Sequence, residues 1–192
     1  MQKTIVAATG NLHKLEEIRQ ILTGYTVLSE AEAGFTGEVE ETGETFRDNA
    51  LLKARAVCKA TGMPALADDS GLCVTALGGA PGVYSARYSG GDSADNRKLL
   101  LKNLENEEER SAKFTCAVAL VFPDGTEYCA IGNTCGVITR EERGTGGFGY
   151  DSLFFSNDLK KTFAEATEAE KNSVSHRGRA LKGLLRAMEL GV

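Results

Sequence analysis

Two adjacent aspartates, Asp68 and Asp69, directly follow a short apolar run at 65–67 that reads as a buried strand. Carboxylates at the end of a strand lie at the rim of a sheet, where open α/β folds bind ligands. Neighbouring residues of a strand point to opposite faces, so the two aspartates are not expected to share one task. Hard oxygen ligands suit Mg²⁺, and Glu40 or Glu41 is the candidate for a further ligand. The alternative is an Asx turn that caps the strand end.

A second candidate site is the turn Thr9, Gly10 and Asn11, which is followed by an expected helix carrying Lys14 in its first turn. The backbone N–H groups and the positive dipole end of a helix N-terminus suit phosphate. The P-loop pattern G-x-x-x-x-G-K-[ST] does not occur in the sequence. The alternative is a plain helix cap by Asn11 with a solvated lysine.

The segment 144–149 matches G-x-G-x-x-G, but it follows a charged segment and leads into a strand. A dinucleotide fingerprint must follow a strand and open a helix, so that interpretation is rejected. What remains is a glycine loop presenting Phe148, Gly149, Tyr150 and Asp151. An aromatic ring that stacks beside a carboxylate that accepts an N–H suits a purine. The alternative is a hairpin loop with one core aromatic.

Lys171, His176 and Arg177 lie at the expected start of the last helix, at 173–190. Cations at a helix N-terminus oppose its dipole unless an anionic or electron-rich ligand compensates. These side chains are donors for phosphate or for a keto oxygen. The alternative is a solvated basic turn.

The elements that must position these residues alternate in type. Helices are expected at 12–22, 45–61 and 93–104, and strands at 4–8, 26–28, 65–67, 113–122, 127–131, 136–139 and 153–155. Pro123, Asp124 and Gly125 form a strong turn signal between two of the strands. Strand–helix–strand units combined with a hairpin predict an α/β fold with a mixed sheet.

The chain has 192 residues, is 26% charged and carries a net charge of −5. These values are typical of a globular domain, so one domain over 1–192 is expected. No apolar run is long enough for a membrane span or a signal peptide, and the acidic balance argues against coating nucleic acid. The five cysteines are odd in number and lack C-x-x-C spacing, so free, mostly buried thiols in the cytoplasm are expected.

Order and spacing of six blocks together resemble the ITPase/Ham1 family. The blocks are Thr9 to Lys14, Glu41 to Ala54, Asp68 to Leu72, Gly79 to Tyr88, Gly144 to Asp151, and Ser175 to Arg177. They run from the first strand to the last helix, and Ser152 departs from the pattern, which has proline there. Bacterial members of this family are non-canonical purine nucleotide pyrophosphatases, also called dITP/XTP pyrophosphatases.

The resemblance implies a two-lobed single α/β domain around an elongated mixed sheet flanked by helices, a homodimer, and Mg²⁺-dependent hydrolysis of ITP, dITP and XTP to monophosphate and pyrophosphate. It implies the following roles. Thr9, Gly10, Asn11 and Lys14 hold the triphosphate, with Lys53 assisting. Glu40 or Glu41 and Asp69 hold Mg²⁺, Asp69 directs the attacking water, and Asp68 is a second candidate for either role. The other substrate-binding residues are Ser70, Phe148, Gly149, Tyr150, Asp151, Lys171, His176 and Arg177.

Base selection follows from hydrogen-bond complementarity: Asp151 accepts from N1–H of hypoxanthine or xanthine, and Arg177 or His176 donates to O6. Adenine presents the reverse pair, and a buried site built on such bonds rejects it by up to ~10⁴–10⁵. The rival function is a nucleotide-binding regulatory module without hydrolysis, which needs no metal carboxylates.

Overall fold

The computed structural model describes residues 3–191 and divides the chain into two compact units. The first unit comprises Met1–Asp69, Cys116–Gly132 and Arg177–Val192, and the second comprises Ser70–Thr115 and Asn133–His176. The expectation of one domain over 1–192 stays a prediction.

The strands form a six-stranded sheet in the order β2-β1-β3-β4-β5-β6. Their bounds are β1 Lys3–Ala7, β2 Tyr25–Ser29, β3 Ala65–Val74, β4 Ser111–Val121, β5 Glu127–Ile138 and β6 Phe154–Ser156. β1 pairs in parallel with both β2 and β3, whereas β5 and β6 are antiparallel. The sheet is therefore mixed, and the predicted α/β class is confirmed.

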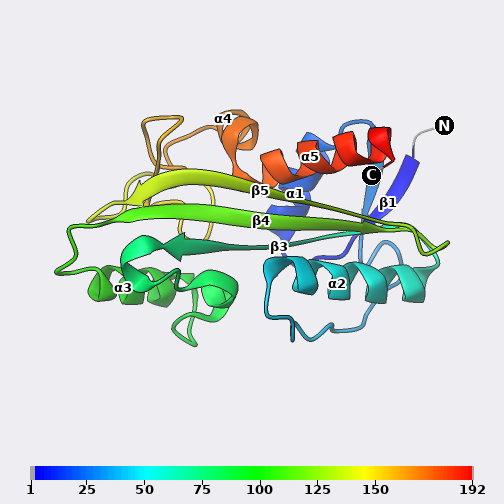
Figure 1. Cartoon of the computed structure of the whole chain (residues 1–192), viewed down its shortest axis with the longest axis horizontal. Coiled ribbons are helices and arrows are strands. Elements are labelled where there is room, and N and C mark those ends of the chain that lie inside the picture. The colour runs from blue at the N-terminus through cyan, green and yellow to red at the C-terminus, as the bar shows by residue number, and fades with distance from the viewer. Residues whose placement is uncertain (1–2, 192) are drawn as a thin grey trace. The chain divides into compact units, whose positions relative to one another are not determined.

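In the first unit, helices cover both faces of the strands. α2 (Phe46–Thr61) lies on one face, and α1 (Leu12–Ile21) and α5 (His176–Leu190) lie on the other (Figure 1). Alternation along β3 assigns Leu66 to the cluster with α1 and α5, and Ala65 and Ala67 to the cluster with α2. The two faces of the strands therefore lead to two separate hydrophobic cores.

The second unit contains α3 (Ser93–Asn103), α4 (Glu168–Val174) and short 3₁₀ turns at Thr75–Leu77 and Gly82–Arg87. Its core includes three aromatic rings that pack together, Phe114, Phe154 and Phe163. Leu100 and Leu104, within and just after α3, belong to the same cluster.

Local signals account for the ends of α1 and α2. The Asn11 side chain accepts from the backbone N–H groups of His13 and Lys14, and Thr45 caps α2 in the same way. Gly62 ends α2 in the left-handed conformation, with φ of 67°. These contacts span a few residues along the chain, so the sequence alone predicts them.

Two expectations about strand bounds are wrong. β3 continues through Asp68 and Asp69 to Val74, because tertiary partners satisfy those carboxylates within the strand. β5 is one strand over Glu127–Ile138, where two were expected.

The last predicted helix is in fact two helices. α4 spans Glu168–Val174 and is opened by a capping box between Thr167 and Glu170, whereas α5 starts at His176. Ser175 between them is extended, with φ of −65° and ψ of 157°. Lys171 therefore belongs to α4 and only His176 and Arg177 lie at the start of α5.

All five cysteines are free, as predicted, but only Cys58 and Cys116 are buried, and Cys135 is exposed. Among residues 3–191, no helix combines the length and the apolar character that crossing a membrane requires.

Candidate functional site

The turn between β1 and α1 forms a compact helix cap. The Asn11 backbone N–H donates to Thr9 Oγ1 at 3.2 Å, and Asn11 Oδ1 accepts from the His13 and Lys14 backbone N–H groups at 3.0 and 3.2 Å. Gly10 is exposed, and a Cβ there would meet nothing within 4 Å. The predicted cap is thus confirmed, and the turn leaves its backbone open to solvent.

Asp68 lies at the centre of a buried ionic cluster in the first unit. Arg177 donates to Asp68 Oδ2 from Nε at 3.2 Å and from Nη2 at 2.8 Å, and its Nη1 bonds to Glu17. Lys14 Nζ lies 3.2 Å from the same Asp68 oxygen. Asp68 and Arg177 are each only 1% exposed, so these charges are removed from water. A buried charge is tolerated only when it is paired, and here two carboxylates share one guanidinium.

The charges of this cluster determine the ionisation of Asp68. Burial alone would raise its pKa, but Arg177, Lys14 and Lys53 outweigh burial and hold the pKa of the Asp68 carboxyl well below its usual range. The second carboxylate oxygen, Oδ1, is buried and has no hydrogen-bond partner within residues 3–191. Asp68 is therefore an ionised carboxylate with one oxygen still able to accept.

Asp69 points to the opposite face of β3, as predicted for adjacent strand residues. Its Oδ2 accepts from Asn49 Nδ2 of α2 at 3.0 Å. Close by, Lys53 Nζ donates to Glu41 Oε1 at 2.6 Å and to the Asp68 carbonyl at 2.7 Å. The structure therefore gathers Glu41, Lys53 and Asp69 on the α2 side of the first unit.

The electrostatics of this second cluster differ from those of Asp68. The pKa of Asp69 is raised, first by burial and further by the nearby Glu41 carboxylate, against the opposing effects of Lys53 and Asn49. The pKa of Lys53 is also raised, because Asp68, Glu41 and Asp69 outweigh its burial. A cation placed between Glu41 and Asp69 would relieve the repulsion between these carboxylates.

Of the two glutamates predicted as metal ligands, Glu40 is exposed and Glu41 is half-buried against Lys53. Within residues 3–191, no three His, Cys, Asp or Glu side chains form a ready-made metal cluster. Two carboxylates completed by phosphate oxygens and water are nevertheless a common set for Mg²⁺. The donors present therefore fit this ion.

In the second unit, the glycine loop carries an aromatic–carboxylate–ammonium group. Asp151 Oδ2 accepts from the Phe148 backbone N–H at 2.9 Å and from Lys171 Nζ at 2.6 Å. The same ammonium lies 4.6 Å from the centre of the Phe148 ring. Asp151 and Lys171 are 4% and 5% exposed, so the ammonium has exchanged water for a carboxylate and an aromatic face.

Gly147 is required for this arrangement. Its φ is +69°, which favours glycine, and a Cβ there would overlap the Asp151 carboxylate. Arg97 of α3 donates to the Gly149 carbonyl at 3.0 Å and so holds the far side of the loop. The glycines of the loop thus bring Phe148 and Asp151 together.

Three further residues predicted to bind substrate lie in the second unit: Tyr150, His176 and Ser70. Tyr150 is 5% exposed, its hydroxyl donates to the Ser85 carbonyl at 2.8 Å, and burial raises its pKa above the ordinary value. His176 stacks on Phe114 with a centroid distance of 4.7 Å. Ser70 is half-buried on β3, directly after Asp69.

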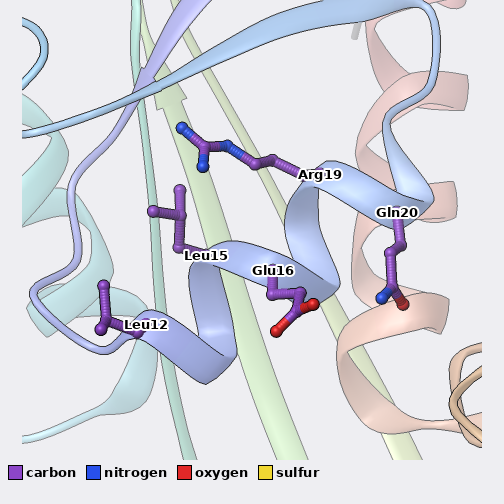
Figure 2. A pocket seen from close by; sticks show the side chains of 5 residues that line it. All are labelled: Leu12, Leu15, Glu16, Arg19 and Gln20. Carbon is purple, nitrogen blue, oxygen red and sulfur yellow. The ribbon is translucent and has the colours of Figure 1, made fainter.

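A surface depression lies elsewhere in the first unit, on α1 (Figure 2). It is lined by Leu12, Leu15, Glu16, Arg19 and Gln20, and by none of the predicted site residues. Arg19 is engaged there with the Val27 carbonyl and Glu32. This depression is distinct from both charged clusters.

Sequence reasoning missed Glu17 and gave no role to Asn49. Glu17 follows Lys14 by three residues, which places the two on one face of α1. Asn49 interrupts the apolar stripe of α2 and is 0% exposed. A polar residue inside an apolar stripe is the signal that would have found it.

Comparison with known proteins agrees with the resemblance. The sequence model of the Ham1 family matches residues 5–187. A protein of Escherichia coli (strain K12) named dITP/XTP pyrophosphatase is 48% identical over 100% of both chains. A protein of the same name from Geobacter sulfurreducens is 53% identical over 92% of each.

Solved structures agree as well. A HAM1 protein from Coxiella burnetii superposes with a TM-score of 0.87 at 40% identity, covering 97% of this chain and 98% of the other. The Staphylococcus aureus Ham1 protein gives a TM-score of 0.86 at 40% identity, over 98% and 99% of the two chains. From this match in sequence and in structure, the chain belongs to the Ham1 family.

Proposed function

We propose that this protein hydrolyses ITP, dITP and XTP to the nucleoside monophosphate and pyrophosphate, and so keeps deaminated purines out of DNA and RNA. The partly buried cluster of Glu41, Lys53 and Asp69 is the observation that carries the proposal, because it places two carboxylates, which suit a metal ion, beside an ammonium group, which suits phosphate. Relatives named dITP/XTP pyrophosphatase that align over 92–100% of this chain support the same activity.

The first unit handles the phosphates. The turn Thr9–Gly10–Asn11, together with Lys14 and Lys53, binds the triphosphate. Ser70, which directly follows Asp69 on β3, also binds substrate. Asp69 orients and deprotonates the water that attacks the α-phosphorus, since its carboxylate lies on the α2 side of β3 close to Lys53 and Glu41. Asp68, which Arg177 keeps ionised, is the alternative for this task.

Glu41 and Asp69 would hold Mg²⁺, with Glu41 preferred over the exposed Glu40. The bound ion would neutralise phosphate charge and lower the pKa of the attacking water. Lys53 keeps Glu41 in place through its 2.6 Å contact.

The glycine loop reads the base. Phe148 stacks on the purine, Asp151 accepts from N1–H, and Gly149, Tyr150 and Lys171 shape the loop around it. O6 receives a hydrogen bond from His176 or Arg177. Arg177 already donates to two carboxylates, so its part in base reading needs a direct test.

The protein works in the cytoplasm as a homodimer on free nucleotides. Five free thiols agree with a reducing compartment. The segment 78–88 is our candidate for the dimer surface, because Tyr84 there is 59% exposed.

The first prediction concerns the reaction itself. Pyrophosphate should appear from ITP, dITP and XTP with Mg²⁺, and at a rate lower by about 10²-fold or more from ATP, whose base presents the reverse hydrogen-bond pattern. A substrate panel with released pyrophosphate as the readout, with and without Mg²⁺, measures this. Nucleotide binding without pyrophosphate release in any condition would instead favour the regulatory binding module.

The second prediction concerns the glycine loop. Gly147→Ala should lower kcat/KM for ITP by about 10–100-fold, because the new Cβ displaces the Asp151 carboxylate from Phe148 and Lys171. Gly90→Ala is the matched control: φ there is +77° and a Cβ would meet nothing within 4 Å. Steady-state kinetics should show a loss for the first variant alone. Equal losses would mean that backbone strain, not the carboxylate, is responsible.

A further inference from the structure

Asn49 joins two parts of the first unit by its side-chain amide. Its Oδ1 accepts from the Gly43 backbone N–H at 2.7 Å, and its Nδ2 donates to Asp69 Oδ2 at 3.0 Å. The side chain is 0% exposed. Both ends of the amide are therefore used in a site closed to water.

The orientation of the amide is determined by its partners. A backbone N–H can only donate, so the oxygen of Asn49 must face Gly43, and the NH₂ group must then face Asp69. An ionised Asp69 can only accept, which agrees with this assignment. No other orientation satisfies both neighbours.

The loop approaches Asn49 so closely that only glycine fits. A Cβ on Gly43 would lie 2.7 Å from Asn49 Oδ1 and 2.7 Å from Asp48 Cβ. Glu41 lies two residues before Gly43, and its carboxylate contacts Lys53 at 2.6 Å. The bond between Asn49 and Gly43 therefore anchors the segment that carries Glu41.

Capping the helix does not require Asn49. Thr45 Oγ1 accepts from the Asp48 backbone N–H at 3.1 Å and donates to Asp48 Oδ2 at 2.6 Å. The N-terminus of α2 thus has its own cap, and the Asn49 side chain serves another purpose.

We infer that Asn49 is a positioning residue that sets the separation and orientation of the Glu41 and Asp69 carboxylates. It holds Asp69 by one end and the Glu41 segment by the other. This inference rests on the function proposed above, in which these two carboxylates hold Mg²⁺. Partners that orient metal ligands in this way affect metal affinity or activity by about 10–100-fold.

The test compares Asn49→Ala with Asn96→Ala. Asn96 is also buried, at 3% exposed, and it bonds to Ala86 and Ser89 within the second unit. Each variant loses buried hydrogen bonds, so the Tm of both variants should be lower than that of the wild type. The discriminating readouts are kcat, KM for ITP, and the Mg²⁺ affinity of the complex with an α,β-methylene ITP analogue, measured by calorimetry.

Asn49→Ala should weaken Mg²⁺ binding and lower kcat by about 10–100-fold each, with KM changed less than about threefold. Asn96→Ala should leave the Mg²⁺ affinity within about threefold of wild type. Wild-type Mg²⁺ affinity in Asn49→Ala, or an equal loss in Asn96→Ala, would overturn the inference.

Asn49→Asp covers the case in which the alanine variant does not fold. It keeps the shape and the acceptor for Gly43 but loses the donor to Asp69, so kcat should fall at least about tenfold. An unchanged kcat would overturn the inference. A wild-type protein that releases no pyrophosphate would refute the proposed function instead, and the calorimetric comparison would still decide the role of Asn49.

Discussion

Asp69→Asn is expected to lower the rate of pyrophosphate release from ITP by about 10²–10⁴-fold, because the amide cannot take a proton from the attacking water and is a poorer ligand for Mg²⁺. The replacement has the same shape. The amide oxygen of the new side chain can still accept a hydrogen bond from Asn49 Nδ2, which lies 3.0 Å from Asp69 Oδ2 in the wild-type protein. The Tm should therefore change little, whereas kcat should fall sharply.

Glu40→Gln is the matched control, since it removes a carboxylate from an exposed side chain of the segment that carries Glu41. Its kcat should stay within about threefold of wild type. Steady-state kinetics on both variants at saturating Mg²⁺ measure the difference. If Asp69→Asn kept more than about a tenth of the wild-type kcat, Asp69 would lose its assigned task and Asp68 would become the candidate.

Arg177→Met is expected to destabilise the protein by about 3–5 kcal/mol, because it leaves the carboxylates of Asp68 and Glu17 buried without their shared guanidinium. For a chain of this length that corresponds to a fall in Tm of about 6–20 °C. Adding Asp68→Asn and Glu17→Gln removes the uncompensated charges, so it should restore part of the loss. A decrease in Tm of less than about 2 °C would contradict this account of the cluster.

The same variant has a characteristic pH dependence. The pKa of Asp68 is held below its ordinary value, so the stability it provides is complete above about pH 4 and is lost as the pH falls toward the lowered pKa. The difference in unfolding free energy between wild type and Arg177→Met should therefore shrink below about pH 4. Denaturant titrations at pH 7 and pH 3.5 measure it.

Arg177→Met also decides between the two donors proposed for O6. A loss of preference for ITP over ATP would assign base reading to Arg177. Unchanged preference would remove Arg177 from base reading and leave His176, whose ring is held by Phe114. Stability and selectivity are separate measurements, so the structural and the base-reading roles are tested independently.

Much of the fold could be predicted because its signals are local. The caps by Asn11 and Thr45 and the stop at Gly62 depend on neighbours two to four residues away. The periodicity of α1 and α2 likewise reports which side of each helix is buried. The α/β class followed from these elements, and the structure confirms it.

The partners of the charged residues could not be predicted in this way. Asp68 and Arg177 are 109 residues apart in sequence, and Arg177 and Glu17 are 160 apart. These contacts depend on the packing of α1 and α5 on the same face of the strands. The polar run at 68–71 was wrongly predicted to end the strand, because the partners of Asp68 and Asp69 are distant in sequence.

By itself, the sequence determined the types of residue available for chemistry, the family, and the helices that begin and end at local signals. Only the tertiary structure decided that Asp68 is an ionised partner of Arg177, that Glu41 rather than Glu40 meets Lys53, and that Asn49 holds Asp69. The physical reason is that burial and ion pairing depend on which elements pack together. Composition and spacing along one chain do not specify those contacts.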